Sequence, residues 1–198
     1  MTNYIFQPCP NFGISEHPFT TWTDAFSSEE IEKLTAYGDA KVTTNAVLGD
    51  NRLDAEYRRS QVAWFDSEQE AMWIFDRMAY IARSLNGQFY RFDLYGFGES
   101  FQYTVYNADD LGHYDWHQDG GIGHNGAPRK LSMVLQLTDP AEYEGGDLEI
   151  MSNKNPVQVQ KQKGLVAVFP SYMMHRVTPV TSGIRKTLVA WITGPSFR

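Results

Sequence analysis

Residues 113–121 have the sequence His-Tyr-Asp-Trp-His-Gln-Asp-Gly-Gly, a short run of β type that carries several metal-binding side chains. Alternate residues of an extended strand point to the same side of a sheet, so His117 and Asp119 are predicted to share one face. An imidazole and a carboxylate on one face are within reach of a single ion. His175, which follows Phe169-Pro170-Ser171, is expected to supply a second imidazole from a distant strand.

The same segment contains a second His-x-Asp pattern, His113 and Asp115, which alternation also places on that face. Spacing alone does not decide between the two pairs. The later pair directly precedes Gly120-Gly121, at a predicted strand end, where sites tend to open. Two imidazoles and one carboxylate are the donor set of non-haem Fe(II) sites, which leave three positions of an octahedral ion open. The pattern therefore predicts an iron site of this kind.

Length and composition limit the other possibilities. The chain has 198 residues, which suits one domain with a sizeable core. Its formal net charge of −7 disfavours nucleic acid and anionic membranes as partners. The one cysteine, Cys9, rules out an internal disulfide and a CxxC motif. Because no apolar run approaches the roughly 20 residues of a membrane span and the N-terminus lacks a signal-peptide pattern, we expect a soluble, cytoplasmic protein.

The first part of the chain contains the helix signals. Residues 1–23 have no helical period and are predicted to form an extended arm or an opening strand. Ser27 and Glu30 have the spacing of a capping box, which predicts a helix that Gly38 ends. Residues 41–56 mix Thr, Asn, Gly and Asp and are typical of a loop.

A strand and a second helix follow this loop. The sequence of Arg58–Phe65 favours a strand. Ser67 with Glu70 again has capping-box spacing, and apolar residues recur at three and four positions through residues 71–85. Asn86-Gly87 is expected to end this helix.

After residue 87 the chain changes to short β-type runs separated by turn residues, with Gly145-Gly146 and Ser182-Gly183 as predicted tight turns. Many short strands at this spacing favour a sandwich or a barrel. We therefore expect a mainly β fold with N-terminal helices. The predicted strands are Phe89–Tyr95, Ser100–Tyr106, His113–Asp119, Lys130–Leu137, Asp147–Met151, Val157–Gln160, Leu165–Phe169, Arg176–Val180 and Lys186–Ile192.

Arg185 and Thr187 are predicted to share one face of an apolar strand. A buried guanidinium needs an anionic partner because an unpaired buried charge is costly. Arginine binds carboxylates through two nitrogens, so this pair suits the distal carboxylate of a dicarboxylic acid. The alternative is a structural salt bridge with one of the 24 acidic residues of the chain.

Together these motifs resemble the 2-oxoglutarate and Fe(II)-dependent oxygenases, in their prolyl 4-hydroxylase-like and PKHD-type branch. The resemblance covers roughly residues 88–198, and the ordered combination of motifs is specific although each one alone is weak. The matching motifs are His117-Gln118-Asp119, Gly145-Gly146-Asp147-Leu148, Gly164 to Phe169-Pro170, His175-Arg176-Val177-Thr178-Pro179-Val180 and Gly183-Ile184-Arg185-Lys186-Thr187-Leu188.

The resemblance implies a single domain over residues 1–198 with a double-stranded β-helix core, the jelly-roll or cupin-like fold. Residues 1–87 would form the helical support region, and residues 88–198 the core that carries the site. The implied Fe(II) ligands are His117, Asp119 and His175. No catalytic residue is implied beyond the metal centre.

For the cosubstrate 2-oxoglutarate, the resemblance implies binding by Arg185, Thr187 and Tyr106. Two departures from the family pattern affect this site. Collagen-type prolyl hydroxylases usually have a lysine where this chain has Arg185. The hypoxia-sensor enzymes carry a tyrosine on the strand that corresponds to Leu131–Leu137, where this chain has none. Thr187 or Tyr106 is expected to take the place of that hydroxyl group.

The implied reaction is hydroxylation of a C–H bond with O2, giving succinate and CO2 as co-products, with ascorbate as a supporting reductant. The expected substrate is a prolyl residue in a peptide or protein. The alternatives are a small molecule such as a free amino acid, and a metal-binding β-helix protein without turnover. Candidate substrate-binding residues are Trp191, Arg58 and His124.

Overall fold

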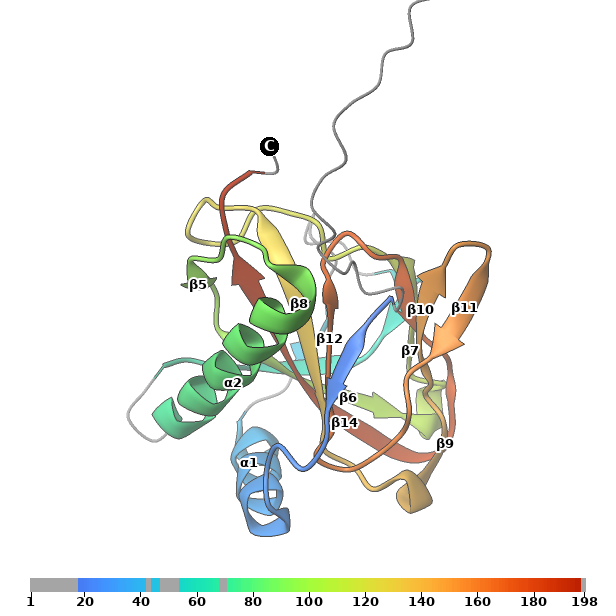
Figure 1. The fold of residues 1–198 in the computed structure, drawn as a ribbon. Helices are drawn as coiled ribbons and strands as arrows, with labels where there is room; N and C mark the ends of the chain where they lie inside the picture. Colours follow the sequence, from blue (N-terminus) through green and yellow to red (C-terminus); the bar gives the residue numbers. More distant parts are fainter. Residues whose placement is uncertain (1–17, 42–43, 47–53, 68–70, 197–198) are drawn as a thin grey trace, which may run out of the picture.

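The computed structural model describes residues 18–41, 44–46, 54–67 and 71–196 (Figure 1). The predictions for Cys9 and for the Glu70 cap therefore lie outside the described residues. In the described part of the chain, no helix is long and apolar enough to cross a membrane.

Helix α1, Ser28–Ala40, begins with the predicted capping box. The Ser27 hydroxyl accepts from the Glu30 backbone N–H at 3.2 Å, and the Glu30 carboxylate accepts from the Ser27 N–H at 2.9 Å. The prediction that Gly38 ends the helix was wrong, because α1 continues to Ala40. A Cβ at Gly38 would lie 2.6 Å from the Tyr103 ring. This glycine therefore lets the helix approach the sheet closely.

Helix α2, Met72–Leu85, buries one stripe of apolar side chains, as its period predicts. Asn86-Gly87 does not stop the helical winding, because a π-helical turn, Asn86–Tyr90, follows directly. The strand predicted at Phe89–Tyr95 was wrong. Tyr90 is instead anchored to the sheet by its hydroxyl, which donates to the Val168 carbonyl at 2.6 Å.

The larger of two antiparallel sheets has nine strands in the order β1-β12-β8-β14-β6-β4-β2, with β5 and β9 paired to β14. Both helices lie on one side of it (Figure 1). Its strands are β1 Thr20–Trp22, β2 Thr44–Asn45, β4 Gln61–Phe65, β5 Gly96–Phe97, β6 Phe101–Asn107, β8 Arg129–Gln136, β9 Tyr143–Gly145, β12 Val166–Pro170 and β14 Val180–Thr193.

The smaller sheet has five strands in the order β11-β10-β13-β7-β3 and lies on the other side of the molecule from the helices (Figure 1). The two sheets with helices outside them confirm the mainly β fold. The strands of this sheet are β3 Arg58–Arg59, β7 His113–His117, β10 Leu148–Ser152, β11 Asn155–Gln158 and β13 His175–Val177.

Two predicted elements have a different form. The strand predicted at Arg58–Phe65 is divided at Ser60, so that β3 joins the smaller sheet and β4 the larger. Ser182-Gly183 is not a turn, because it lies inside β14. There the register with β9 shifts, and Gly183 has φ +71° with its Cβ direction blocked by the Glu142 carbonyl. The positive φ of Gly183, which is typical of turns, explains why Ser182-Gly183 was predicted as a turn.

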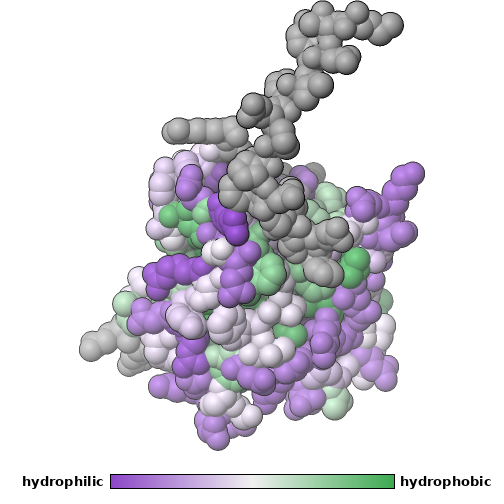
Figure 2. Space-filling model, viewed as in Figure 1, coloured by the Kyte–Doolittle hydropathy of each residue, from purple (hydrophilic) through white to green (hydrophobic). Residues whose placement is uncertain are grey.

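The core is divided by the larger sheet. Leu131, Met133 and Leu135 of β8 face the helices and belong to the cluster that packs α1 and α2. A second cluster, which includes Ile150 and Phe169, fills the space between the sheets. On the face shown in Figure 2 the outer surface is mostly hydrophilic, with small hydrophobic areas between. Alternation along β8 and β14 therefore sends every second side chain into the interior of the sandwich.

Candidate active site

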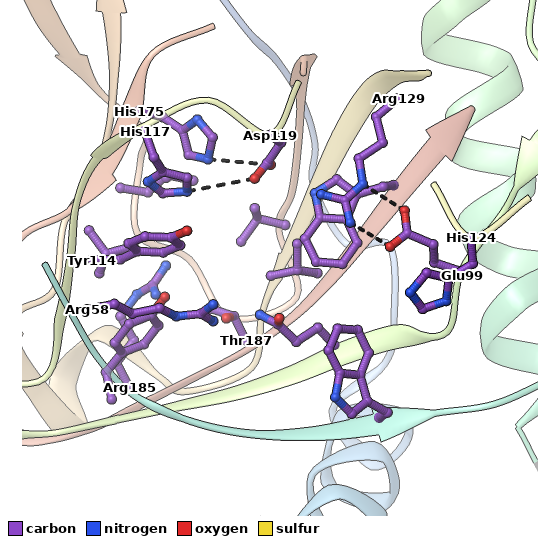
Figure 3. A pocket seen from close by; sticks show the side chains of 18 residues that line it. Arg58, Glu99, Tyr114, His117, Asp119, His124, Arg129, His175, Arg185 and Thr187 are labelled. Carbon is purple, nitrogen blue, oxygen red and sulfur yellow. Dashed lines mark hydrogen bonds and ion pairs between the residues drawn. The ribbon is translucent and has the colours of Figure 1, made fainter. Parts of the chain in front are cut away.

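Three predicted metal ligands meet at one end of the smaller sheet. His117 ends β7, His175 begins β13, and the two residues are paired directly across these strands. Asp119 lies two residues beyond β7. Its Oδ1 is 3.7 Å from His117 Nε2, and its Oδ2 is 3.5 Å from His175 Nε2 (Figure 3). The candidate ligand atoms all lie within 4.8 Å of one another, so one ion can contact all three.

Hydrogen bonds fix which ring nitrogens face the ion. His117 Nδ1 lies 2.7 Å from the Asp115 carbonyl, and His175 Nδ1 lies 2.9 Å from the Met173 carbonyl. A carbonyl can only accept, so each Nδ1 carries the proton and each Nε2 presents a lone pair. The Asp119 Oδ2 accepts from the buried Ser132 hydroxyl at 2.7 Å. Both rings and the carboxylate are therefore oriented before an ion binds.

The electrostatics of the cluster suit a divalent cation. Burial, with the nearby His175, lowers the pKa of His117 to about 4. Burial acts to raise the pKa of Asp119, but the two imidazoles and the Ser132 hydroxyl outweigh it and hold this pKa below its usual value. At neutral pH the cluster thus offers a neutral His117 imidazole and a charged carboxylate, as a divalent metal requires.

A β-bulge in β7 decides between the two His-x-Asp patterns. His175 and Val177 of β13 pair with His117 and Tyr114, so one residue of β13, Arg176, lies opposite two of β7, Asp115 and Trp116. The extra residue breaks alternation, and both His117 and Tyr114 line the cavity described below. The prediction that the earlier pair shares this face was wrong. His113 instead points away and bonds backbone carbonyls at 2.8 and 3.0 Å.

A cavity of about 310 Å³ lies beside the cluster and has two distinct ends (Figure 3). One end is lined by Arg58, Tyr106, Tyr114, Arg185 and Thr187. The other end is lined by Trp64, Glu99, His124, Arg129 and Trp191. We call these the arginine end and the ion-pair end. The His117 imidazole stacks on Tyr114 of the arginine end, and Asp119 faces His117 and His175 (Figure 3).

At the arginine end, Arg185 and Thr187 share the inner face of β14 as predicted, and both are buried. The Arg185 guanidinium lies 5.4 Å from the centre of the Tyr106 ring. Its Nε has no hydrogen-bond partner, and no ion pair to Arg185 occurs in the described part of the chain. Gly146 makes room for this side chain, because a Cβ there would lie 2.8 Å from Arg185 Cδ.

Tyr106 is buried at the same end. Burial raises the pKa of its hydroxyl, although Arg58 and Arg185 both act in the opposite direction. The hydroxyl group therefore stays protonated and can donate a hydrogen bond. Arg58, a predicted substrate-binding residue, lines this end, with its guanidinium 4.5 Å from the centre of the Tyr114 ring; its contact with substrate stays a prediction.

The ion-pair end contains two charged residues that the sequence did not indicate. Arg129 Nε and Nη2 donate to the two carboxylate oxygens of Glu99 at 2.7 and 2.5 Å. The guanidinium also lies 4.1 Å from the centre of the Trp191 ring. Trp191 and His124, which were predicted to contact substrate, both line this end, beside Trp64. The pairing of residues 30 positions apart has no local sequence signal.

Comparison with known proteins agrees with this geometry. Residues 101–193 match the model of the 2OG-Fe(II) oxygenase superfamily. The fold is similar to a prolyl hydroxylase from Trichoplax adhaerens solved with a hypoxia inducible factor peptide, with a TM-score of 0.74 and 16% identity, covering 89% of this chain and 84% of that one. A prolyl-4-hydroxylase of Pseudomonas putida gives a TM-score of 0.71 and 20% identity, covering 91% and 94%. These structures identify the double-stranded β-helix fold.

Relatives by sequence are PKHD-type hydroxylases. One from Synechococcus sp. (strain CC9311) is 40% identical over 91 residues, which cover 46% of this chain and 41% of that protein. One from Klebsiella pneumoniae (strain ATCC 700721) is 28% identical over 186 residues, which cover 85% of this chain and 75% of that protein. The matched family model, the related sequences and the shared fold agree, and together they support assignment to the 2OG-Fe(II) oxygenase superfamily, in its prolyl-hydroxylase-like, PKHD-type branch.

Proposed function

We propose that the protein is an Fe(II)- and 2-oxoglutarate-dependent dioxygenase that hydroxylates a C–H bond of a prolyl residue in a peptide or protein. The observation that carries this proposal is a cavity holding both a His-Asp-His cluster and a buried arginine with an unpartnered nitrogen. The cluster fits a metal, and the arginine fits a carboxylate. A non-catalytic metal-binding protein would have no use for the second feature.

His117, Asp119 and His175 would hold Fe(II), and two neutral nitrogens with one carboxylate suit this ion. Arg185 would bind the distal carboxylate of 2-oxoglutarate, with Thr187 and the Tyr106 hydroxyl as further donors. When bound, iron with 2-oxoglutarate and O2 supplies the oxidation of the C–H bond, with succinate and CO2 as co-products.

The chain itself positions the reactants and keeps water out. Val134, Leu148, Val177 and Val189 give the cavity an apolar wall. The two Nδ1 hydrogen bonds hold the imidazoles so that their Nε2 atoms face Asp119. Ser132 holds the carboxylate from the other side. Because these contacts are made by the chain itself, they hold the metal-binding side chains in one orientation for the reactants.

The ion-pair end is the proposed substrate side. Glu99 and Arg129 neutralise each other, and Trp191 and Trp64 supply aromatic walls. An uncharged ring such as that of a prolyl residue suits such walls. Trp64 is 42% exposed, so the aromatic surface continues to the outside, where the rest of a peptide can lie.

A second candidate is a small-molecule hydroxylase. The limited cavity volume of about 310 Å³, which 2-oxoglutarate would share, favours a substrate no larger than an amino acid. A free amino acid would face Glu99 with its ammonium group and Arg129 with its carboxylate. The cytoplasmic location, the single-domain organisation and the support by ascorbate stay predictions from the sequence.

The test is succinate formation by protein purified without oxygen and then given Fe(II), 2-oxoglutarate, ascorbate and air. Wild type is expected to form succinate, while His175→Ala and Arg185→Ala are not. Proline-containing peptides and free amino acids are then added separately, and mass spectrometry detects the gain of one oxygen atom. If wild-type protein neither turns over nor binds 2-oxoglutarate in the presence of metal, the proposal fails.

A further inference from the structure

Arg58 is a second arginine at the arginine end of the cavity, and it comes from a different sheet. Arg185 enters from β14 of the larger sheet, whereas Arg58 enters from β3 at the edge of the smaller one. Both line the cavity with Tyr106 (Figure 3). The break at Ser60, which separates β3 from β4, is what allows Arg58 to approach from the opposite wall.

The Arg58 side chain is held in position but not neutralised. Its Nε donates to the Ser60 hydroxyl at 3.0 Å, and its guanidinium packs on the Tyr114 ring. Tyr114 in turn stacks on the His117 imidazole, with 3.5 Å between ring centres. The Nη2 of Arg58 is buried and has no hydrogen-bond partner. The guanidinium thus lines the cavity, and its Nη2 can donate a hydrogen bond to a ligand.

The carboxylates that line the cavity do not neutralise either arginine. Glu99 is paired with Arg129 at the opposite end. Asp119 accepts from Ser132 and faces the two imidazoles. In the described part of the chain, Arg58 and Arg185 therefore lie at one end of the cavity without a carboxylate partner.

Arg185 is buried and Arg58 is half-buried with a buried Nη2. Two such like charges without an anion destabilise the site through lost solvation and through mutual repulsion. One ligand group relieves both costs if it is anionic and has two acceptor oxygens. A carboxylate has this form and can bridge two guanidinium groups, one on each oxygen. Strand β8 lines this cavity with Arg129, which is paired with Glu99 at the ion-pair end, and with the apolar Val134, so it adds no carboxylate at the arginine end.

We propose that Arg58 and Arg185 form a two-arginine clamp on the distal carboxylate of 2-oxoglutarate. This inference rests on the proposed function and adds Arg58 to the cosubstrate site. With two cations facing one carboxylate, the site discriminates strongly against 2-oxo acids that lack the distal carboxylate. Because Arg58 packs on Tyr114, which packs on His117, the clamp also links the cosubstrate to a metal ligand.

The test measures ligand binding and therefore does not require the hydroxylated substrate. Mn(II)-loaded full-length protein is titrated without oxygen by calorimetry, once with 2-oxoglutarate and once with 2-oxobutyrate. The second ligand keeps the C1 carboxylate and the keto group but lacks the distal carboxylate. Mn(II) affinity is measured separately for every variant, so that a changed metal site is recognised as such.

Arg58→Gln is expected to weaken 2-oxoglutarate binding roughly tenfold to a hundredfold. Its affinity for 2-oxobutyrate should change by less than about twofold, because that ligand has no group for the clamp. The matched control is Arg59→Gln. Arg59 lies next in the same strand, does not line the cavity and bonds the Ala55 and Asp110 carbonyls instead. Both affinities should stay unchanged in that variant.

Equal weakening of both ligands by Arg58→Gln, or no weakening of 2-oxoglutarate, would overturn the clamp. If Arg185→Gln alone loses 2-oxoglutarate affinity, the proposed function stands and only the inference fails. If wild-type protein binds neither ligand, the proposed function itself fails. Should Arg58→Gln not fold, Arg58→Lys, which keeps the charge but not the planar donors, must show the same selective loss for 2-oxoglutarate.

Discussion

The two ends of the cavity use arginine in opposite ways. At the ion-pair end, Arg129 has its own carboxylate partner, Glu99, and an aromatic ring beneath it. At the arginine end, Arg58 and Arg185 have buried nitrogens without any partner in the described structure. A paired arginine forms part of a neutral wall, whereas a buried arginine nitrogen without a partner in the chain suits an anionic ligand. The difference assigns the arginine end to an anionic ligand and the ion-pair end to a group of no net charge.

The largest expected effect concerns the metal-ligand cluster, which lies against the arginine end. His175→Ala removes one of three metal ligands and should weaken Fe(II) or Mn(II) binding by at least about a thousandfold, because few donors remain. His113→Ala is the matched control, since this imidazole belongs to the other His-x-Asp pattern and points away. Metal titration of both variants checks the result. Comparable losses in the two variants would mean that the earlier pattern also binds metal.

The comparison predicts opposite effects on stability at the two ends. Glu99→Gln leaves Arg129 without its anion and should lower the free energy of unfolding by about 2 kcal/mol. Arg185→Gln removes an unpaired buried charge and should leave the ligand-free protein unchanged or stabilise it by about 1 kcal/mol. Urea denaturation of both variants, without metal or 2-oxoglutarate, measures the difference.

A double variant controls for the ion-pair result. Glu99→Gln combined with Arg129→Gln removes both charges, and two amides can hydrogen-bond in their place. The double variant should recover most of the stability that Glu99→Gln alone loses. If Arg185→Gln destabilises the ligand-free protein as strongly as Glu99→Gln does, Arg185 is paired in solution and the distinction between the ends is lost.

A smaller effect is expected at Ser132, whose hydroxyl donates to Asp119 and lies 3.1 Å from the Ser171 hydroxyl. Ser132→Ala frees the carboxylate to rotate and should weaken metal binding by about tenfold. Ser171→Ala keeps the bond to Asp119 and should have a lesser effect. Metal affinities of the two variants test this order. Equal losses would show that the two hydroxyls act as one unit.

Most of the metal site could be predicted because residues close together in the sequence form it. His117 and Asp119 are two residues apart, and Arg185 and Thr187 are too, so alternation along a strand places each pair. Capping at Ser27 is likewise local and was confirmed. His175 was expected from the motif order, and the structure places it directly opposite His117.

The rest depends on contacts between distant segments. The bulge in β7 exists only in relation to β13, so strand alternation misplaced His113. The predicted strand 58–65 is divided at Ser60 because its first part pairs with the smaller sheet and its second part with the larger sheet. This division places Arg58 at the arginine end of the cavity. Gly38 was interpreted as a helix end because its packing against Tyr103 is invisible in the sequence. For the same reason the sequence did not indicate the pairing of Glu99 with Arg129.

The last prediction extends the charge comparison to pH. Burial lowers the pKa of His117 to about 4, below its ordinary value of 6.5. Between these two values the unfolded chain binds a proton that the folded metal-free protein does not. Stability should therefore fall with falling pH across this window, by up to about 1.4 kcal/mol per pH unit, and the contribution should level off below about pH 4.

The measurement is urea denaturation of metal-free protein between pH 7 and pH 5, for wild type and for His117→Gln. Glutamine does not titrate, so the variant should lose less stability than wild type over this range. Parallel curves would mean that His117 is protonated in the folded metal-free protein. In that case the cluster would carry a positive charge before metal binds, and the contrast between a neutral centre and a charged arginine end would fail.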